Sequence, residues 1–320
     1  MIFEKQIVNM YKGMMHTRCD ENGTAFYFSA ADFAGLHQDP YCFTSSAGHC
    51  LKGYLYFYDA PVAGRLIVFD HGFGGGHRAY MKEIETLCKH GYRVLAYDHT
   101  GCMESGGETP NGMAQSLCDL NDCITAVKAD ERFRGLDISV MGHSWGGFSS
   151  LNITALHPEI SHLVVLAGFV CVQDLVNSFF GGLLRGYRKA ILKIEQEANP
   201  HFIGYHAVSS LKDSNAQVLL VYSANDHLCK RSHFDTLQKG LAHKDNIKFL
   251  LLKSKGHNPN YTEDAVAYLG KYIAKRTKLM KKGKLATAQQ KQEFLALWDW
   301  DKMTAQDEAV WKEIFACLDK

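Results

Sequence analysis

Short, continuous apolar runs recur along the chain and limit it to a few folds. They are not alternations of apolar and polar residues, and continuous runs are typical of strands in a sheet covered on both faces. Several of the stretches between them have apolar residues at helical spacing, as in residues 80–90 and 115–129. Strand–helix–strand repetition implies right-handed crossovers and a mainly parallel sheet. The predicted strands cover residues 66–69, 93–97, 138–141, 163–166, 218–222 and 248–252.

Two regions interrupt this repetition. Residues 171–216 separate the fourth and fifth of these strands, which is far more than a simple connection needs, and their helical pattern predicts a cap. The C-terminal region contains a basic run, KRTKLMKKGK, and two helix patterns, each opening with Thr and followed three residues later by Gln290 or Asp307. We therefore expect an N-terminal extension (1–50), an α/β core (51–170 and 217–275), a cap (171–216) and a C-terminal helical extension (276–320).

The last of these helix patterns carries an apolar stripe, which either packs on the main body or forms a homodimer contact. The cap is a second candidate for such a contact. The stripe consists of Val310, Trp311, Ile314, Phe315 and Leu318.

Composition and charge exclude several classes of protein. Lys and Arg total 35 against 34 for Asp and Glu, a formal charge of +1, which argues against a generally basic nucleic-acid binder. The 10 cysteines form no CxxC pair, so neither a disulfide framework nor a zinc site is expected. The longest apolar run, residues 163–172, is too short to span a membrane, and charges at Glu4 and Lys5 argue against a signal peptide. We expect a cytoplasmic protein without a cofactor, a metal or stable membrane insertion.

A nucleophile is predicted at Ser144. The segment Gly142-His143-Ser144-Trp145-Gly146 fits G-x-S-x-G, directly follows a predicted strand and precedes a plausible helix. That context is typical of a nucleophile elbow, in which a tight turn exposes the serine and small flanking residues avoid a clash.

Serine needs a base to remove its proton, and the base needs a carboxylate to orient it. Asp226 and His257 each follow a predicted strand, in the chain order serine, acid, histidine. Both fall at the strand ends where open α/β sheets place their sites. Asp174 is the alternative acid. His227, next to Asp226 in the sequence, is expected at the surface or facing the cap.

A glycine-rich loop after the first parallel strand, Asp70 to His77, supplies candidate oxyanion donors. Its His-Gly-x-Gly pattern allows the backbone to approach a substrate closely. The backbone N–H groups of Phe73 and Trp145 are the predicted donors. A phosphate-binding loop is the alternative, but the G-x-G-x-x-G spacing and the G-K-[ST] ending are both missing.

With these motifs in order, residues 51–272 resemble the α/β-hydrolases of the monoacylglycerol lipase and serine aminopeptidase-like branch. The stretches that carry the resemblance are HGFGGGHRAY, YDHTGCMESGGE, GHSWGG, SANDHLC and SKGH. The resemblance implies an eight-stranded sheet, a lid between the sixth and seventh strands, no cofactor, and a triad matching Ser144, Asp226 and His257. It also matches Phe73 to the oxyanion position.

The expected reaction is hydrolysis of a small-molecule carboxylic ester through an acyl-enzyme, most simply of short or medium acyl or aryl esters. Monoacylglycerol lipase-type and aminopeptidase or amidase activities are the alternatives, and a non-catalytic binding protein on a hydrolase scaffold is a further one. An aminopeptidase would need acidic cap residues to bind the substrate amine. Apolar cap residues are the candidates for the substrate pocket: Phe179, Phe180, Leu184 and Tyr187.

Overall fold

A computed structural model describes residues 3–61 and 64–320 of the chain, so the first two residues of the expected N-terminal extension lie outside it. All the predicted strands are present and belong to one eight-stranded sheet with the order β1-β2-β4-β3-β5-β6-β7-β8. Strands β3 to β8 are parallel, whereas β1 and β2 form an antiparallel hairpin at one edge. The strands are β1 (His37–Thr44), β2 (Cys50–Phe57), β3 (Arg65–Asp70), β4 (Arg93–Tyr97), β5 (Asp137–His143), β6 (His162–Leu166), β7 (Gln217–Ser223) and β8 (Ile247–Leu252).

The expected boundary at residue 50 is wrong, because β1 lies inside the predicted extension and pairs with β2 along its whole length. As an edge strand, β1 has solvent on much of its surface. Only Tyr41 and Phe43 of it are buried, so it lacks the apolar run that marks the central strands. Helix α1 (Glu4–Met15), also in this region, has no counterpart in the sequence prediction.

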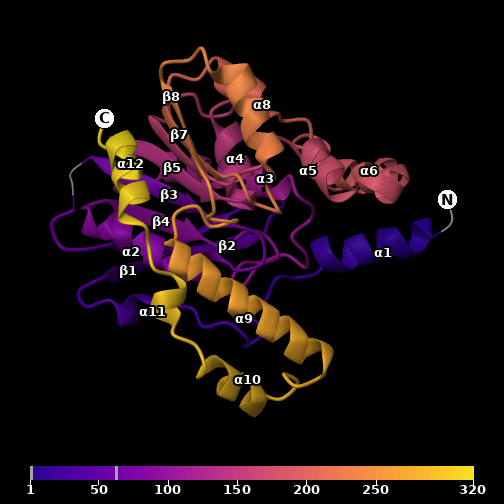
Figure 1. Ribbon diagram of the computed structural model, residues 1–320. Helices are drawn as coiled ribbons and strands as arrows, with labels where there is room; N and C mark the ends of the chain where they lie inside the picture. Colours follow the sequence, from indigo (N-terminus) through magenta and orange to yellow (C-terminus); the bar gives the residue numbers. More distant parts are fainter. Residues whose placement is uncertain (1–2, 62–63) are drawn as a thin grey trace.

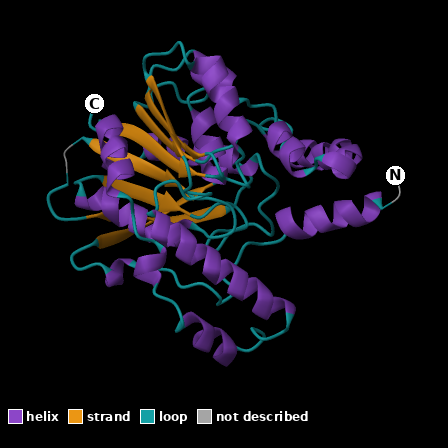
Figure 2. Cartoon of the chain, in the orientation of Figure 1, coloured by secondary structure: helices purple, strands orange, loops and turns teal. Residues whose placement is uncertain are grey.

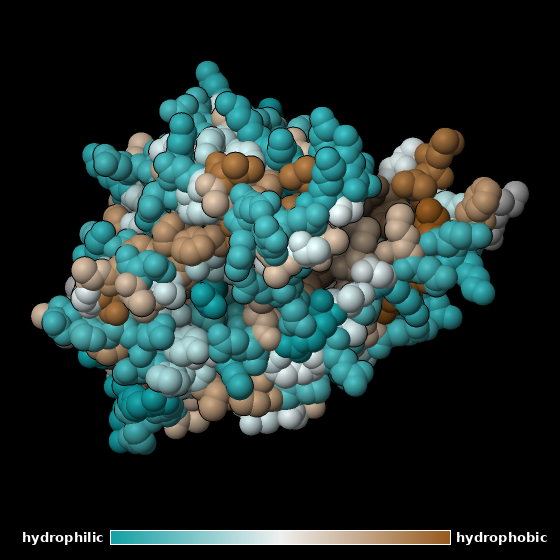
Figure 3. Space-filling view, turned by 90° about the horizontal axis from the view of Figure 1, so that it is seen from below, coloured by the Kyte–Doolittle hydropathy of each residue, from teal (hydrophilic) through white to brown (hydrophobic). Residues whose placement is uncertain are grey.

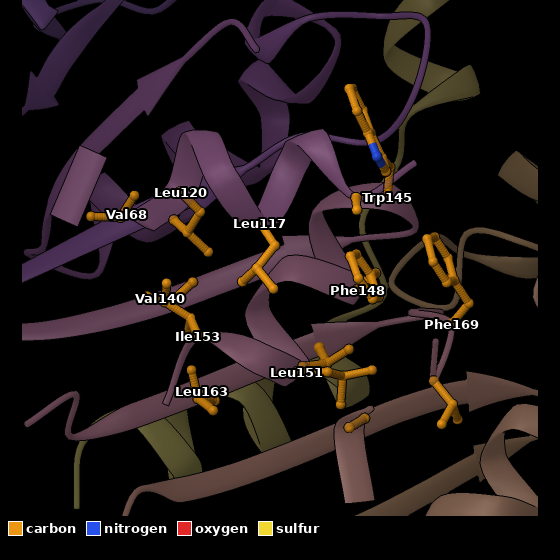
Figure 4. Close-up of a cluster of buried hydrophobic side chains, with 14 of the residues drawn as sticks. Val68, Leu117, Leu120, Val140, Trp145, Phe148, Leu151, Ile153, Leu163 and Phe169 are labelled. Carbon is orange, nitrogen blue, oxygen red and sulfur yellow. The ribbon is translucent and has the colours of Figure 1, made fainter. Parts of the chain in front are cut away.

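Helices cover both faces of the sheet (Figures 1 and 2). Alternate strand residues face opposite sides: Val68 packs with α3 and α4, whereas Phe69 packs with α2 and α12. Figure 4 shows the first of these two cores, where Leu117 and Leu120 lie over Val140. The helices that cover the sheet are α2 (Met81–Lys89), α3 (Gln115–Ala129), α4 (Trp145–Ile153), α7 (Ala207–Lys212), α8 (Arg231–Leu241) and α12 (Glu308–Leu318).

A helical insertion occupies residues 171–216, between β6 and β7, and projects beside α1 (Figure 1). The helical pattern of residues 183–198 does not give one continuous helix. Instead, α5 (Val172–Phe179) ends at the Phe-Phe-Gly-Gly segment, a 3-10 turn η4 (Gly182–Tyr187) follows, and α6 (Arg188–Ala198) comes after it.

The C-terminal region packs on the core through α12 and forms a second, separate cluster of its own. Val310, Trp311, Ile314 and Leu318 of α12 are buried against the second face of the sheet, whereas Phe315 stacks on His90. The apolar stripe is therefore covered by the chain's own sheet. A smaller cluster joins helices α9 (Glu263–Lys281), α10 (Ala288–Leu295) and α11 (Trp300–Met303).

The predicted helix starts in this region have different outcomes. Thr287 and Gln290 form the expected capping box of α10. The capping prediction for α12 is wrong, since Asp307 is itself the N-cap and its carboxylate accepts from the N–H groups of Ala309 and Val310. None of the helices in the described part of the chain is both long and apolar enough to cross a membrane.

Candidate active site

Ser144, Asp226 and His257 follow the carboxyl ends of β5, β7 and β8, which are on the same edge of the parallel sheet. The connection after β5 is a sharp turn: Ser144 has φ 56° and ψ −107°, a backbone conformation that non-glycine residues rarely adopt. A Cβ on Gly146 would lie 2.0 Å from the carbonyl oxygen of Asp70, so only glycine fits there. The local sequence thus fixes the serine at the start of α4 with its side chain in a cavity.

The three side chains form a hydrogen-bonded series. The Ser144 hydroxyl donates to Nε2 of His257 at 2.8 Å, and Nδ1 of His257 donates to Oδ2 of Asp226 at 2.7 Å. The buried Asp226 is held in turn by the backbone N–H groups of Leu228 and Cys229, 2.7 and 3.1 Å from Oδ1. An imidazole placed between a serine hydroxyl and a carboxylate can remove the serine's proton and remain correctly oriented.

The alternative acid, Asp174, does not pair with His257. It lies in the first turn of α5, where its backbone N–H donates to the Cys171 sulfur. Cys171, Asp174 and His206 bring potential metal-binding atoms within 4.8 Å of one another at the base of the insertion, and none of them lines the cavity around Ser144. His227 is exposed, as expected.

The loop carrying Phe73 is held by His71. His71 Nε2 accepts from the backbone N–H of His99 at 3.0 Å, so the proton is on Nδ1, which donates to the carbonyl of Gly72 at 2.7 Å. Burial, followed by the charge of His99, lowers the pKa of His71 to about 3 and keeps it neutral. The C=O and N–H of a trans peptide point in opposite directions. Fixing the Gly72 carbonyl therefore also fixes the direction of the Phe73 N–H.

The N–H groups of Phe73 and Trp145 make no hydrogen bond to any other group among the residues that the structure describes. Trp145 is the first residue of α4, where a helix has no internal acceptor for an N–H group. Both residues line the cavity that contains Ser144. Two N–H groups on the same cavity are available to a developing oxyanion.

A second network joins this loop to the His257 loop. The backbone N–H of Gly72 donates to the Tyr80 hydroxyl at 3.0 Å, and that hydroxyl lies 2.8 Å from Nδ1 of His143. His143 Nε2 lies 2.7 Å from the carbonyl of His257. Because a carbonyl only accepts, Nε2 carries the proton and the Tyr80 hydroxyl donates to Nδ1. Sequence reasoning missed both side chains, although His143 occupies the variable position directly before the serine.

The cavity around Ser144 is about 240 Å³ in volume and mostly apolar. Of the four predicted pocket residues, only Phe179 lines it. Its lining consists of Met15, Gly72, Phe73, Tyr80, Met113, His143, Ser144, Trp145, Phe169, Leu175, Phe179, Leu228, Cys229 and His257.

The prediction for Phe180, Leu184 and Tyr187 is wrong as regards this lining, and the break in the insertion explains why. Phe180 caps α5, is buried, and packs edge-to-face on Tyr11 of α1. Leu184 and Tyr187 belong to the 3-10 turn η4, and neither side chain lines the cavity. Met15 and Met113 line the cavity instead. They belong to segments in which no sequence pattern indicated a pocket.

Cys229 is the one thiol among the lining residues. Burial, followed by the charge of Asp226, raises the pKa of its thiol well above the usual range. The thiol therefore stays protonated and is a poor nucleophile at neutral pH. The activated hydroxyl of Ser144 is the reactive group that this arrangement favours.

Comparison with known proteins agrees with this architecture. The family model described as serine aminopeptidase, S33, matches residues 63–203. A Pyrococcus furiosus esterase superposes with a TM-score of 0.60 at 18% identity, covering 84% of this chain and 98% of the esterase. The chain has the α/β-hydrolase fold. Acetyl xylan esterase 1 of Thermoanaerobacterium shares the fold, with a TM-score of 0.55 at 15% identity over 80% of this chain and 89% of that one.

Curated relatives match a shorter part of this chain. RutD of Serratia proteamaculans, a proposed carbamate hydrolase, is 31% identical over 126 residues, which is 38% of this chain and 44% of RutD. The 2-hydroxy-6-oxononadienedioate/2-hydroxy-6-oxononatrienedioate hydrolase of Escherichia coli is 33% identical over 129 residues, 38% of this chain and 42% of that enzyme. The chain thus aligns with less than half the length of these relatives.

Proposed function

We propose that this α/β hydrolase cleaves neutral carboxylic esters with short or medium acyl or aryl groups through an acyl-serine intermediate. The observation that carries the proposal is the hydrogen-bonded series from Ser144 through His257 to Asp226, which opens into an apolar cavity. Nucleophile, base and orienting acid lie within hydrogen-bond reach, as this chemistry requires.

In this mechanism Ser144 attacks the ester carbonyl while His257 Nε2 takes its proton. Asp226 stabilises the imidazolium, and the N–H groups of Phe73 and Trp145 bind the oxyanion. His257 then protonates the leaving alkoxide, and a water molecule activated by the same imidazole hydrolyses the acyl-enzyme. One oxyanion donor typically lowers the barrier by about 3 kcal/mol, so the loop around Phe73 contributes substantially to the rate.

The size of the cavity favours small substrates. Its volume of about 240 Å³ lies below the ~300–1,000 Å³ typical of pockets for drug-sized ligands. A long acyl chain of a monoacylglycerol would extend beyond it. Phe179 and Leu228, 40% and 49% exposed, mark the part of the lining that is open to solvent.

The polarity of the lining argues for an uncharged substrate. Among the described residues that form it, none carries a carboxylate, a lysine ammonium or a guanidinium group. An aminopeptidase needs an acid for the substrate amine, and a dicarboxylate substrate such as that in the name of the E. coli relative needs cations. Neither class of substrate finds its counter-charge in this cavity.

The test is the Ser144→Ala variant assayed on p-nitrophenyl esters from acetate to dodecanoate, alongside the matching anilides. We expect hydrolysis of the shorter esters by the wild type, little cleavage of the anilides, and loss of at least ~1,000-fold in the variant. Ser232→Ala, on the exposed surface of α8, is the matched control. Retained turnover in Ser144→Ala, or failure of a fluorophosphonate to label Ser144 in the wild type, would refute the proposal.

A further inference from the structure

Glu195 is a fully buried carboxylate to which the proposed chemistry gives no role. It lies on α6 of the insertion, and its side chain is 0% exposed. Burial of a charged group is costly unless hydrogen bonds compensate it. What its two oxygens contact is therefore informative.

One oxygen holds the N-terminal helix. The Tyr11 hydroxyl of α1 donates to Oε1 of Glu195 at 2.6 Å, and His16 Nε2 lies 3.5 Å from the same atom. Burial, followed by the charge of Glu195, raises the pKa of Tyr11 far above its ordinary value, so the phenol remains a donor. Met15, one turn beyond Tyr11 on α1, lines the cavity around Ser144.

The other oxygen holds the loop before α3. The backbone N–H of Met113 donates to Oε2 at 2.6 Å. Gly112 precedes it with φ +87°, and a Cβ there would lie 2.8 Å from Oε2, so the loop approaches the carboxylate as closely as glycine permits. Met113 also lines the cavity, and its carbonyl accepts from Nε1 of Trp145 at 2.7 Å.

We infer that Glu195 is a positioning residue for the acyl pocket. By holding α1 with one oxygen and the Met113 loop with the other, it places Met15 and Met113 in the cavity lining and so determines how much of an acyl chain the pocket accepts. The inference deepens the proposed ester hydrolysis and rests on it for its kinetic readout. Figure 3 shows hydrophobic atoms gathered at the right-hand projection, the side on which Figure 1 places both α1 and the insertion.

The test compares Glu195→Gln and Tyr11→Phe with the wild type on p-nitrophenyl acetate and octanoate. Gln retains the size of Glu195 but replaces one acceptor by a donor, and Phe removes only the hydroxyl of Tyr11. We expect KM for the octanoate to rise about tenfold, the effect of losing one hydrogen bond to a charged group. Because its acyl group has only two carbons, we expect the acetate to depend less on the methionines and to keep kcat and KM within about twofold.

Glu197→Gln is the matched control, since Glu197 lies on the same helix but is exposed and pairs with Lys193 at 3.7 Å. Thermal unfolding followed by circular dichroism establishes that each variant folds, and Tyr11→Phe decides the matter if Glu195→Gln does not. An unchanged ratio of octanoate KM to acetate KM in a folded variant overturns the inference. This holds if neither KM changes, and also if both rise equally, because a general loss of structure would produce an equal rise.

Binding without turnover separates this inference from the proposed function. The p-nitrophenyl esters of octanoate and acetate are titrated by calorimetry into Ser144→Ala, with and without Glu195→Gln. If the wild type hydrolyses no ester, the proposed function fails. A roughly tenfold weaker octanoate affinity in the double variant would then still support the role of Glu195, and an equal affinity would refute it.

Discussion

His143 Nε2 donates a hydrogen bond to the backbone carbonyl of His257 across 2.7 Å. The residue directly before the candidate nucleophile therefore holds the residue that accepts the nucleophile's proton. Burial, followed by the charge of His257, lowers the pKa of His143 to about 3, so it stays neutral at physiological pH. A neutral imidazole can accept from Tyr80 and donate to His257 at the same time.

Replacing His143 by Ala should slow the reaction without weakening substrate binding. The variant leaves the Tyr80 hydroxyl and the His257 carbonyl without their partner, at a cost of about 1–3 kcal/mol. If this free energy is added to the activation barrier, kcat falls roughly ten- to a hundredfold and KM changes little. Steady-state kinetics on p-nitrophenyl acetate measure it. The exposed His227→Ala is the control, and an unchanged kcat in a folded His143→Ala protein would contradict the positioning role.

Replacing Gly146 by Ala should destabilise the fold. The new Cβ would lie 2.0 Å from the Asp70 carbonyl oxygen, which is backbone and cannot move away cheaply. We expect the free energy of unfolding to fall by about 3 kcal/mol, at the upper end for overpacking. Urea denaturation measures it. The contrast is Gly270→Ala within α9, where nothing lies within 4 Å and helix propensity predicts a gain of about 1 kcal/mol. Equal stabilities for the two variants would be inconsistent with the close approach.

The C-terminal region should affect the rate through the His257 loop. Asp307 accepts from the buried Lys255 ammonium, and Asp307 N–H donates to the Asn260 carbonyl at 2.8 Å. Asp307→Asn keeps a good N-cap for α12 but removes the counter-charge of Lys255. We expect a loss of about 1–3 kcal/mol in stability and a roughly tenfold lower kcat. Glu313→Gln, which breaks only the exposed ion pair of Glu313 with Lys248, should change neither.

Glu83 should make stability depend on pH near neutrality. Burial raises its pKa to about 7, and the hydrogen bond from Asn260 only partly opposes this. The folded state then binds a proton that the unfolded state releases at lower pH. This contribution to stability is fully present only below the unfolded pKa of about 4.5, and between pH 5 and pH 8 the free energy of unfolding falls by about 2.5 kcal/mol. Urea unfolding of Glu83→Gln at both pH values should show a smaller loss than in the wild type. The exposed Glu131→Gln should retain the wild-type dependence, and parallel curves for all three proteins would contradict the prediction.

The sheet was predictable from sequence because its central strands are buried on both faces and read as apolar runs. Strand β1 was not, since an edge strand with two buried side chains leaves a weak pattern. Ser144, Asp226 and His257 could be selected because each follows such a run. Met15 and Met113 could not, because their place in the cavity depends on long-range contacts through Glu195, which neither periodicity nor spacing records. Leu184 and Tyr187 do not line the cavity because they lie in the 3-10 turn η4, which the sequence pattern did not distinguish from a helix.

The hydrogen bonds of Gln306 and Asp307 to the His257 loop can form only late in the synthesis of the chain. Asn260 donates to Gln306 at 2.9 Å, and Thr262 N–H donates to the Ala305 carbonyl at the same distance. A ribosome adds about 5–20 residues per second, so this segment emerges on the order of ten seconds after Ser144. Until then the loop bearing His257 lacks its hydrogen bonds to the C-terminal segment.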